Sequence, residues 1–277
     1  MNSKKNIIRR HEAMVDDPLR TPILEQAITR LVKPGDVVFD LGCGLGILTR
    51  AALKAGASHV YACEIDESIV LARENIKKAG YEKKVTFFNE LSSEVELPEK
   101  VDVILAETVG TLGLNENIMP FVADARSRFL KKTGVILPQR LQVFIAPCDF
   151  VLPKQNLKNS FCIEEIPFQS LLAPAQIYHD VSFLKNTKYG VDQELVFQIK
   201  RSGRLMGLAV WFTATWAPGF QTLTVPGEPL THWKQGFLPV ESTSLRSGEK
   251  IVCRLIMGPD EEIFSTESLV EWGWKKI

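Results

Sequence analysis

The sequence predicts an α/β fold in two parts: a doubly wound parallel sheet followed by an antiparallel β barrel or sandwich. From residue 16 to residue 137, short β-branched runs alternate with segments whose apolar residues recur at helical spacing, which is typical of parallel α/β sheets. After Pro138 almost no helical period remains, and apolar runs are separated by turns containing glycine and proline, which indicates antiparallel strands. We therefore expect a first domain over 1–137 and a second over 138–277.

The expected elements of the first domain alternate regularly along the chain. Helical spacing of apolar residues predicts helices over 22–31, 47–54, 66–78 and 118–130. Short apolar runs predict strands over 37–40, 59–65, 85–88 and 101–106. Gly56 and Gly80 follow two of the helices, as glycines often do at helix C-termini. A turn is expected at 132–134, and the clearest strands of the second domain are expected over 141–145, 194–200, 205–215 and 251–257.

The bulk composition restricts the classes of function. A formal net charge of zero provides no overall field for nucleic acid or an anionic membrane, so neither is an expected partner. No apolar run approaches membrane-spanning length, and the first ten residues lack the apolar core of a signal peptide. The five cysteines are odd in number and form no Cys-x-x-Cys pair. We therefore expect free thiols in a reduced, cytoplasmic protein, and no metal site.

A glycine-rich segment between the first expected strand and the next helix is the strongest functional signal. Residues 40–46 read Asp-Leu-Gly-Cys-Gly-Leu-Gly. Glycines let the backbone approach a ligand closely, and the helix N-terminus offers free N–H groups. Glu64 ends the next strand, where its carboxylate can accept hydrogen bonds from both hydroxyls of a ribose. A nicotinamide cofactor would require glycine at position 47, which is isoleucine, so it is the weaker alternative, together with a turn that binds no ligand.

Two glutamates nine residues apart, Glu107 and Glu116, bracket the loop that follows the strand expected at 101–106. Open α/β sheets bind ligands at the carboxyl ends of their strands. Two carboxylates at this edge can grip one planar guanidinium through bidentate, charge-assisted hydrogen bonds. Because the arginine cation is a poor nucleophile, such a pair would orient one nitrogen for attack and stabilise the charge as a proton leaves. Surface glutamates are common, so the pair alone does not decide the function.

Together with further motifs, these segments resemble protein arginine N-methyltransferases, which are class I S-adenosylmethionine-dependent enzymes. Residues 40–46 are similar to motif I of that class, and the two glutamates match the family's double-glutamate loop. The family's Thr-His-Trp loop matches 231–233, its N-terminal helix motif matches 11–21, and 124–138 follow the pattern that leads into its β-barrel. The resemblance covers nearly the whole chain. It implies a Rossmann-like methyltransferase domain with N-terminal helices, followed by an antiparallel β-barrel substrate domain.

The resemblance also implies roles for individual residues. Arg20 would pair with the carboxylate of the cofactor's methionine moiety, and His11 and Met14 would lie on a helix that covers the cofactor. Asp17 and His232 would form a carboxylate–imidazole pair that relays a proton to solvent. With the two glutamates, this pair makes up the predicted catalytic set. The predicted S-adenosylmethionine site consists of His11, Met14, Arg20, Asp40, Gly42, Gly44 and Glu64.

The chain departs from the family pattern in three places, which makes it a short, divergent member. It lacks the two tyrosines that the family carries upstream of the helix motif. Thr108, Val109 and Thr111 replace the family's Trp, Met and Tyr in the double-glutamate loop, which predicts a wider and less apolar acceptor channel. The family's dimerisation arm would lie within 149–168 and looks shortened. A homodimer is still the expected assembly.

The function predicted from these motifs is methyl transfer from S-adenosylmethionine to a guanidino nitrogen of arginine, in a peptide, in a protein or in a free guanidino compound. Two alternatives stay open at this stage. The acceptor could lack a guanidino group, or the chain could be an inactive family member that serves as a binding protein. The missing tyrosines favour an inactive member, whereas the retained Glu107 and Glu116 argue against it.

Overall fold

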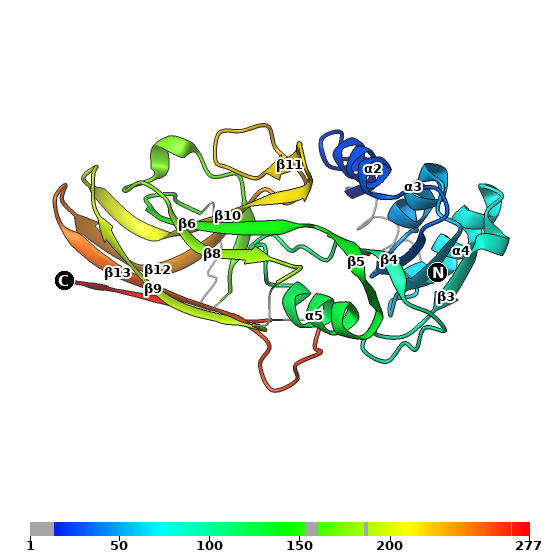
Figure 1. Ribbon diagram of the computed structural model, residues 1–277. Helices are drawn as coiled ribbons and strands as arrows, with labels where there is room; N and C mark the ends of the chain where they lie inside the picture. Colours follow the sequence, from blue (N-terminus) through cyan, green and yellow to red (C-terminus); the bar gives the residue numbers. More distant parts are fainter. Residues whose placement is uncertain (1–13, 153–159, 186–187, 267) are drawn as a thin grey trace.

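The computed structural model describes residues 14–152, 160–185, 188–266 and 268–277. The described strands form one parallel and two antiparallel sheets. In Figure 1 the parallel sheet and the helices labelled α2, α3 and α4 occupy one end of the molecule, and the antiparallel strands occupy the other. The predicted fold class, a parallel α/β sheet followed by antiparallel β structure, is confirmed.

The parallel sheet has the strand order β3-β2-β1-β4-β5. Its strands are β1 (Val37–Leu41), β2 (His59–Cys63), β3 (Val85–Phe88), β4 (Val101–Ala106) and β5 (Leu130–Leu137). The α-helices are α2 (Arg20–Leu31), α3 (Ile47–Ala55), α4 (Ser68–Lys78) and α5 (Ile118–Phe129), and a short 3₁₀ helix, η1 (Glu82–Lys84), precedes β3. All five residues of β1 are buried, as expected for a central strand covered on both faces. None of the described helices is long and apolar enough to cross a membrane.

The antiparallel half begins with β6, which two residues separate from the end of β5. Six strands form a sheet in the order β7-β12-β10-β6-β8, with β11 paired to β10, and three form the sheet β14-β13-β9. Their bounds are β6 (Arg140–Cys148), β7 (Cys162–Glu164), β8 (Gln176–Ser182), β9 (Val191–Gln198), β10 (Gly203–Ala217), β11 (Phe220–Leu223), β12 (Gln235–Leu245), β13 (Lys250–Gly258) and β14 (Leu269–Lys276), with the 3₁₀ helix η2 (Phe168–Ser170) between β7 and β8.

The turn expected at 132–134 is wrong, because these residues lie inside β5. This strand pairs in parallel with β4, with Val135 opposite Val103. The register shifts between Leu130 and Val135, so the Lys-Thr-Gly signal falls on an irregularity inside the strand and not on a turn that ends it. Gly134 is needed for a different reason: a Cβ atom there would come within 2.5 Å of the Leu130 side chain and 2.9 Å of the Asp102 carbonyl oxygen.

The loop between Glu107 and Glu116 packs its middle into the antiparallel half. Leu112 is fully buried, and a Cβ atom at Gly236 of β12 would lie only 2.0 Å from its side chain. A Cβ atom at Gly113 would lie 2.9 Å from Val143 of β6. The loop is therefore anchored between the two halves, and its two ends carry the glutamates to the site.

Candidate active site

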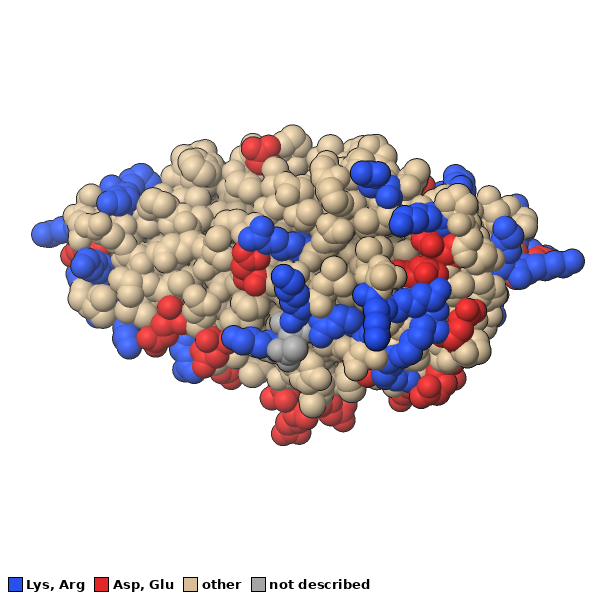
Figure 2. All heavy atoms as spheres, in the orientation of Figure 1, with Lys and Arg blue, Asp and Glu red and all other residues tan. Residues whose placement is uncertain are grey.

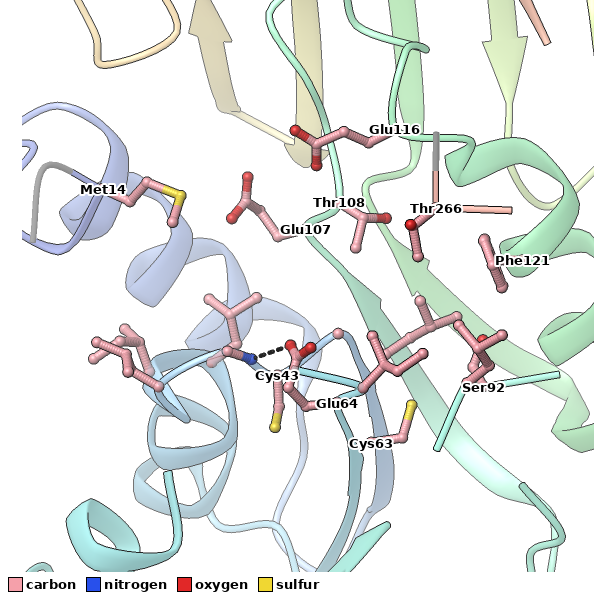
Figure 3. Close-up of a pocket in the computed structure, with 18 of the residues that line it drawn as sticks. Met14, Cys43, Cys63, Glu64, Ser92, Glu107, Thr108, Glu116, Phe121 and Thr266 are labelled. Carbon is pink, nitrogen blue, oxygen red and sulfur yellow. Dashed lines mark hydrogen bonds between the residues drawn. The ribbon is translucent and has the colours of Figure 1, made fainter. Parts of the chain in front are cut away.

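The described residues enclose a cavity of about 290 Å³ where β1, β2 and β4 end (Figure 3). In this view Glu107 and Glu116 lie on one side of the cavity, and Glu64 and the two cysteines of the strand ends lie on the other. The wall combines residues of the parallel sheet with residues from distant parts of the chain: Met14, Arg20, Gly42, Cys43, Gly44, Cys63, Glu64, Ser92, Glu107, Thr108, Glu116, Phe121 and Thr266.

The glycine-rich loop forms one wall of this cavity. Gly42, Gly44 and Gly46 all have positive φ values, of 73°, 52° and 79°, a conformation that glycine adopts without steric cost. The backbone N–H of Gly42 donates to the carbonyl of Cys63 at 3.0 Å, which holds the loop against the end of β2. A Cβ atom at Gly42 would meet the methyl group of Thr108 at 2.8 Å. The loop therefore requires glycine for both its backbone and its close contacts.

Glu64 lies on the cavity wall at the end of β2. One of its carboxylate oxygens accepts the backbone N–H of Gly44 and the other that of Asp66, each at 2.9 Å. A carboxylate offers about four acceptor positions, so both oxygens can still accept hydroxyl groups. Nearby, the hydroxyl of Ser92 lines the same cavity, is buried, and has no hydrogen-bond partner within the described part of the chain. This wall fits a nucleoside, which brings both hydroxyls and a polar ring.

Asp40 does not line the cavity, although the sequence led us to expect that it binds the cofactor. Its carboxylate is fully buried and accepts a short hydrogen bond, 2.5 Å, from the hydroxyl of Thr49 on α3. Burial raises the pKa of Asp40 to about 7, against the hydrogen bonds from Thr49. The side chain is bonded to α3 and does not line the cavity, so its role here is to support the packing of that helix.

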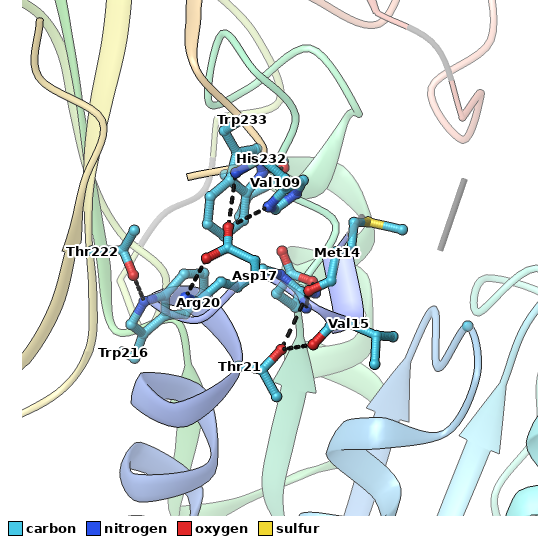
Figure 4. A network of polar contacts seen from close by, with 12 residues as sticks. Met14, Val15, Asp17, Arg20, Thr21, Val109, Trp216, Thr222, His232 and Trp233 are labelled. Atoms are coloured by element: carbon cyan, nitrogen blue, oxygen red, sulfur yellow. Dashed lines mark hydrogen bonds and ion pairs between the residues drawn. The ribbon is translucent and has the colours of Figure 1, made fainter. Parts of the chain in front are cut away.

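The predicted carboxylate–imidazole pair is brought together from opposite ends of the sequence (Figure 4). One oxygen of Asp17 accepts the backbone N–H of His232 at 2.8 Å and lies 3.1 Å from the Nδ1 atom of its ring. The other oxygen accepts the backbone N–H groups of Leu19 and Arg20, both at 2.9 Å. The same carboxylate thus orders the start of α2 and fixes the loop that carries His232.

Burial controls the protonation of this pair. It lowers the pKa of His232 to about 4, with a further decrease from the charge of Arg20 and a partial increase from Asp17. Burial raises the pKa of Asp17, but hydrogen bonds from the backbone of His232, Arg20 and Leu19 and from the His232 ring outweigh it and lower the pKa overall. At neutral pH the site therefore holds a carboxylate beside a neutral imidazole.

Arg20 lies between the N-terminal segment and the double-glutamate loop. Its guanidinium forms an ion pair with Glu107 and donates to the carbonyl of Met14 at 3.1 Å. It also lies 5.6 Å from the centre of the Trp233 ring. Burial lowers the pKa of Arg20 to about 10, against the charges of Asp17 and Glu116, so it is a cation at neutral pH. Its Nε atom is buried and has no hydrogen-bond partner among the residues described.

The residues between the two glutamates differ in what they face. Thr108 lines the cavity, whereas Val109 and Thr111 are buried away from it. The carbonyl of Val109 accepts the indole N–H of Trp233 at 2.6 Å, which joins the Thr-His-Trp loop to the double-glutamate loop. Glu116 lines the cavity. Burial raises the pKa of its carboxyl group, although the positive charge of Arg20 partly offsets this increase.

Comparison with known proteins identifies the family. The model of the ribosomal protein L11 methyltransferase (PrmA) family matches residues 21–138. Protein arginine N-methyltransferase 6 of Xenopus tropicalis is 30% identical, over 91% of this chain and 84% of that protein. The chain belongs to the protein arginine N-methyltransferase family. The resemblance predicted from the sequence motifs is thus confirmed. Arginine N(omega)-methyltransferase of Streptomyces achromogenes is 27% identical, over 91% of this chain and 77% of that protein.

Solved structures of the arginine methyltransferase family share the fold. The Trypanosoma brucei PRMT1 enzyme–prozyme heterotetrameric complex with AdoHcy matches with a TM-score of 0.79 and 21% identity, over 96% of this chain and 98% of that chain. Arabidopsis thaliana protein arginine methyltransferase 10 matches with a TM-score of 0.80 and 21% identity, over 96% of this chain and 97% of that chain. Both likenesses support a methyltransferase domain followed by a β-barrel domain.

Within this methyltransferase cavity, the structure brings together most of the residues that the motifs predicted. Met14, Arg20, Gly42, Gly44, Glu64, Glu107 and Glu116 line the cavity, and Asp17 and His232 lie beside it. His11 lies outside the described residues. The lining residues that were not predicted include Ser92, Phe121 and Thr266. Ser92 follows β3, so its place at the sheet edge could have been inferred, but no sequence signal connects Thr266 to the cavity.

Proposed function

We propose that this chain transfers the methyl group of S-adenosylmethionine to a guanidino nitrogen of arginine. One observation carries this proposal: a guanidinium, that of Arg20, already pairs with Glu107 on the cavity wall that also holds Glu116. The wall is therefore complementary to the chemical group that the family methylates. Family membership supports the same activity.

The glycine-rich loop and Glu64 fit the nucleoside part of the cofactor, and Arg20 supplies a cation for its carboxylate. When bound, S-adenosylmethionine supplies an electrophilic methyl group on a sulfonium centre. The unpartnered Nε atom of Arg20 offers one free donor, although its other nitrogens contact Glu107 and Met14. Arg20 can therefore hold a carboxylate on one side and order Glu107 on the other.

The two glutamates perform the positioning. A carboxylate pair can hold a guanidinium by charge-assisted hydrogen bonds and direct one nitrogen along the line of attack. Ideal positioning of this kind can lower an activation barrier by up to roughly 7–11 kcal/mol. Glu107 is ordered by Arg20, and Glu116 is free to meet the acceptor. As the nitrogen gains the methyl group it loses a proton. The imidazole of His232, held by Asp17, is neutral, and with a pKa of about 4 it is a weak base that could take this proton only to pass it on to solvent.

The experiment is a methyl-transfer screen read by mass spectrometry. The purified chain is incubated with S-adenosylmethionine and either arginine-containing peptides or free arginine, and additions of one methyl mass are expected on the guanidino group. Glu107→Gln should lower the turnover number roughly 10²- to 10³-fold. Full activity in that variant would contradict the mechanism. Transfer that was insensitive to changes at Glu116 would indicate a non-guanidino acceptor, and absence of cofactor binding would indicate a binding protein.

We also propose that the chain forms a homodimer and is located in the cytoplasm. A heterotetramer of the Trypanosoma brucei relative supports assembly into oligomers in this fold. Light scattering coupled to size-exclusion chromatography would give the mass in solution, and a monomer at all concentrations would contradict the first proposal.

Five free, buried cysteines support a reducing compartment for this chain. Fractionation of the source cells would test the second proposal.

A further inference from the structure

The loop that follows β13, residues 259–266, returns from the antiparallel half to the cavity. In Figure 1 it is the orange-red loop at the lower edge, beyond the end of α5. Its first residues, 260–262, are exposed acids, and Figure 2 shows acidic side chains projecting into solvent at that edge. Its last residue, Thr266, lines the cavity together with Glu116 and Phe121. One end of this loop therefore lies in solvent and the other forms part of the active-site wall.

Hydrogen bonds to Asn117 hold this loop in place. The side-chain amide of Asn117 donates to the carbonyl oxygen of Ser265 at 2.9 Å and approaches that of Ile263 at 3.5 Å. Its carbonyl oxygen accepts the hydroxyl of Ser268 at 3.1 Å. Phe264 adds an apolar contact, with its ring 5.5 Å from that of Phe121. The Asn117 amide therefore bonds both to this loop and to Ser268 just beyond it, and the amide and hydroxyl of Ser268 add bonds to the carbonyls of Asn115 and Leu114.

The backbone conformation of Asn117 explains why its side chain bonds to the distant loop and not to the helix that follows it. Asn117 precedes α5 and has φ 57°, in the left-handed region that asparagine and glycine tolerate best. Its side chain makes no capping hydrogen bond to the helix and is 1% exposed. An asparagine before a helix commonly caps it. Here the amide points away from the helix and toward the distant loop.

We propose that Asn117 is a positioning residue for methyl transfer, which fastens the 259–266 loop to the end of the double-glutamate loop and so holds Glu116 and Thr266 at the cavity. This inference rests on the proposed function. Glu116 is the neighbouring residue in the chain, so the orientation of its carboxylate depends on the backbone of Asn117. A displacement of about 1 Å at an acceptor site can lower a rate up to roughly 100-fold.

The test variant is Asn117→Gly, because glycine keeps the left-handed backbone and removes only the amide. We expect the specificity constant (kcat/KM) for an arginine peptide to fall about tenfold. The dissociation constant for S-adenosylhomocysteine, measured by calorimetry, should change less than about threefold, because the glycine-rich loop and Glu64 are untouched. A wild-type specificity constant in the folded variant would overturn the proposal.

Tyr178→Phe is the matched control. The buried hydroxyl of Tyr178 bonds the carbonyls of Val191 and Leu255 between antiparallel strands, and it does not line the cavity. Its loss should lower stability to a similar degree and leave the specificity constant unchanged. An equal kinetic loss in this control would show that Asn117 acts only through stability, which would also overturn the proposal.

Hydrogen exchange tests the anchor without any turnover. The amides of Ser265 and Ser268 are bonded to the carbonyls of Glu262 and Asn115. In Asn117→Gly their exchange should become at least about fivefold faster, whereas Tyr178→Phe should leave it unchanged. Unchanged exchange in Asn117→Gly would overturn the anchoring. A wild-type chain that transferred no methyl group would contradict the proposed function instead, and the exchange rates would still decide whether Asn117 holds the loop.

Discussion

The two ends of the cavity are built in different ways. At the cofactor end, the contacts join the ends of adjacent parallel strands, within one strand–helix–strand unit: Gly42 bonds to Cys63, and Gly44 to Glu64. At the acceptor end, the contacts that tie the double-glutamate loop to the rest of the site bridge long distances along the chain, from Arg20 to Glu107 and from Val109 to Trp233. The cofactor end is thus a local motif on the parallel sheet, and the acceptor end is assembled by the tertiary fold.

This difference has a consequence for sequence variation. A local motif keeps its geometry as long as its own few residues are kept. The acceptor end instead depends on packing, because Leu112 and Gly113 lie against strands of the antiparallel half. The substitutions Thr108, Val109 and Thr111 therefore change a loop whose course is fixed from outside it.

The pH dependence of stability should separate the two ends most strongly. The pKa of His232, at the acceptor end, is about 4 when folded and about 6.5 when unfolded, so the unfolded chain binds the extra proton and stability falls as pH falls from 6.5 to 4. The pKa of Asp40, at the cofactor end, is about 7 when folded and about 3.9 when unfolded, so stability rises as pH falls through the same range. The contribution is about 3 kcal/mol for His232 and about 4 kcal/mol for Asp40, and in the wild type they oppose each other.

Urea denaturation between pH 4 and pH 7 would reveal both contributions in variants. In Asp40→Asn only the His232 contribution remains, so the stability of this variant should rise with pH. In His232→Gln only the Asp40 contribution remains, so the stability of that variant should fall with pH. Parallel profiles for the two variants would show that the two groups do not titrate with opposite effects.

The second largest effect is expected at the glycine-rich loop. Gly42→Ala places a side chain at φ 73° and 2.8 Å from the Thr108 methyl group. Affinity for S-adenosylhomocysteine should fall about thirtyfold, which corresponds to about 2 kcal/mol. The double variant Gly42→Ala, Thr108→Ser removes the methyl group and should recover part of this affinity in calorimetry. No recovery would indicate that backbone strain, and not the contact with Thr108, causes the loss.

The smallest effect is expected for Trp233→Phe, which removes the indole N–H that bonds to Val109. Stability should fall by about 1 kcal/mol, and the acceptor KM should rise severalfold because the double-glutamate loop loses its tie. Trp272→Phe is the matched control, since its indole N–H donates to the carbonyl of Pro239 at 2.7 Å, between two strands of the antiparallel half. It should lose similar stability in denaturant titration with no change in KM. A KM change in both variants would remove the distinction.

The same division decides what the sequence could predict. The parallel strands were predictable because their β-branched runs are short and buried, and Gly42, Gly44 and Glu64 were predictable because their spacing reflects one turn between a strand and a helix. The strand β5 was missed because the turn signal at 132–134 falls on a register shift inside the strand, between Leu130 and Val135. Asp40 was assigned to the cavity because its motif suggests a ligand, but the direction of its side chain depends on packing against α3.

At the acceptor end, the family motifs supplied the residues and the fold supplied the contacts. Nothing in the sequence shows that the carboxylate of Asp17 accepts the backbone N–H of a residue 215 positions later. Thr266 and Asn117 carry no motif at all, and only the return of the β13–β14 connection reveals them. Contacts between distant segments depend on topology, which a single sequence specifies only through the whole fold.

The burial of Leu112 beneath Gly236 also limits how this protein could be re-engineered. A chimaera that joined this chain to the second half of a relative at residue 138 would keep the double-glutamate loop but replace the surface that receives it. The exchanged strands would meet Leu112 and Gly113 with unmatched side chains, and the glutamates would shift. A working hybrid would therefore have to take residues 109–114 and the antiparallel half from the same parent.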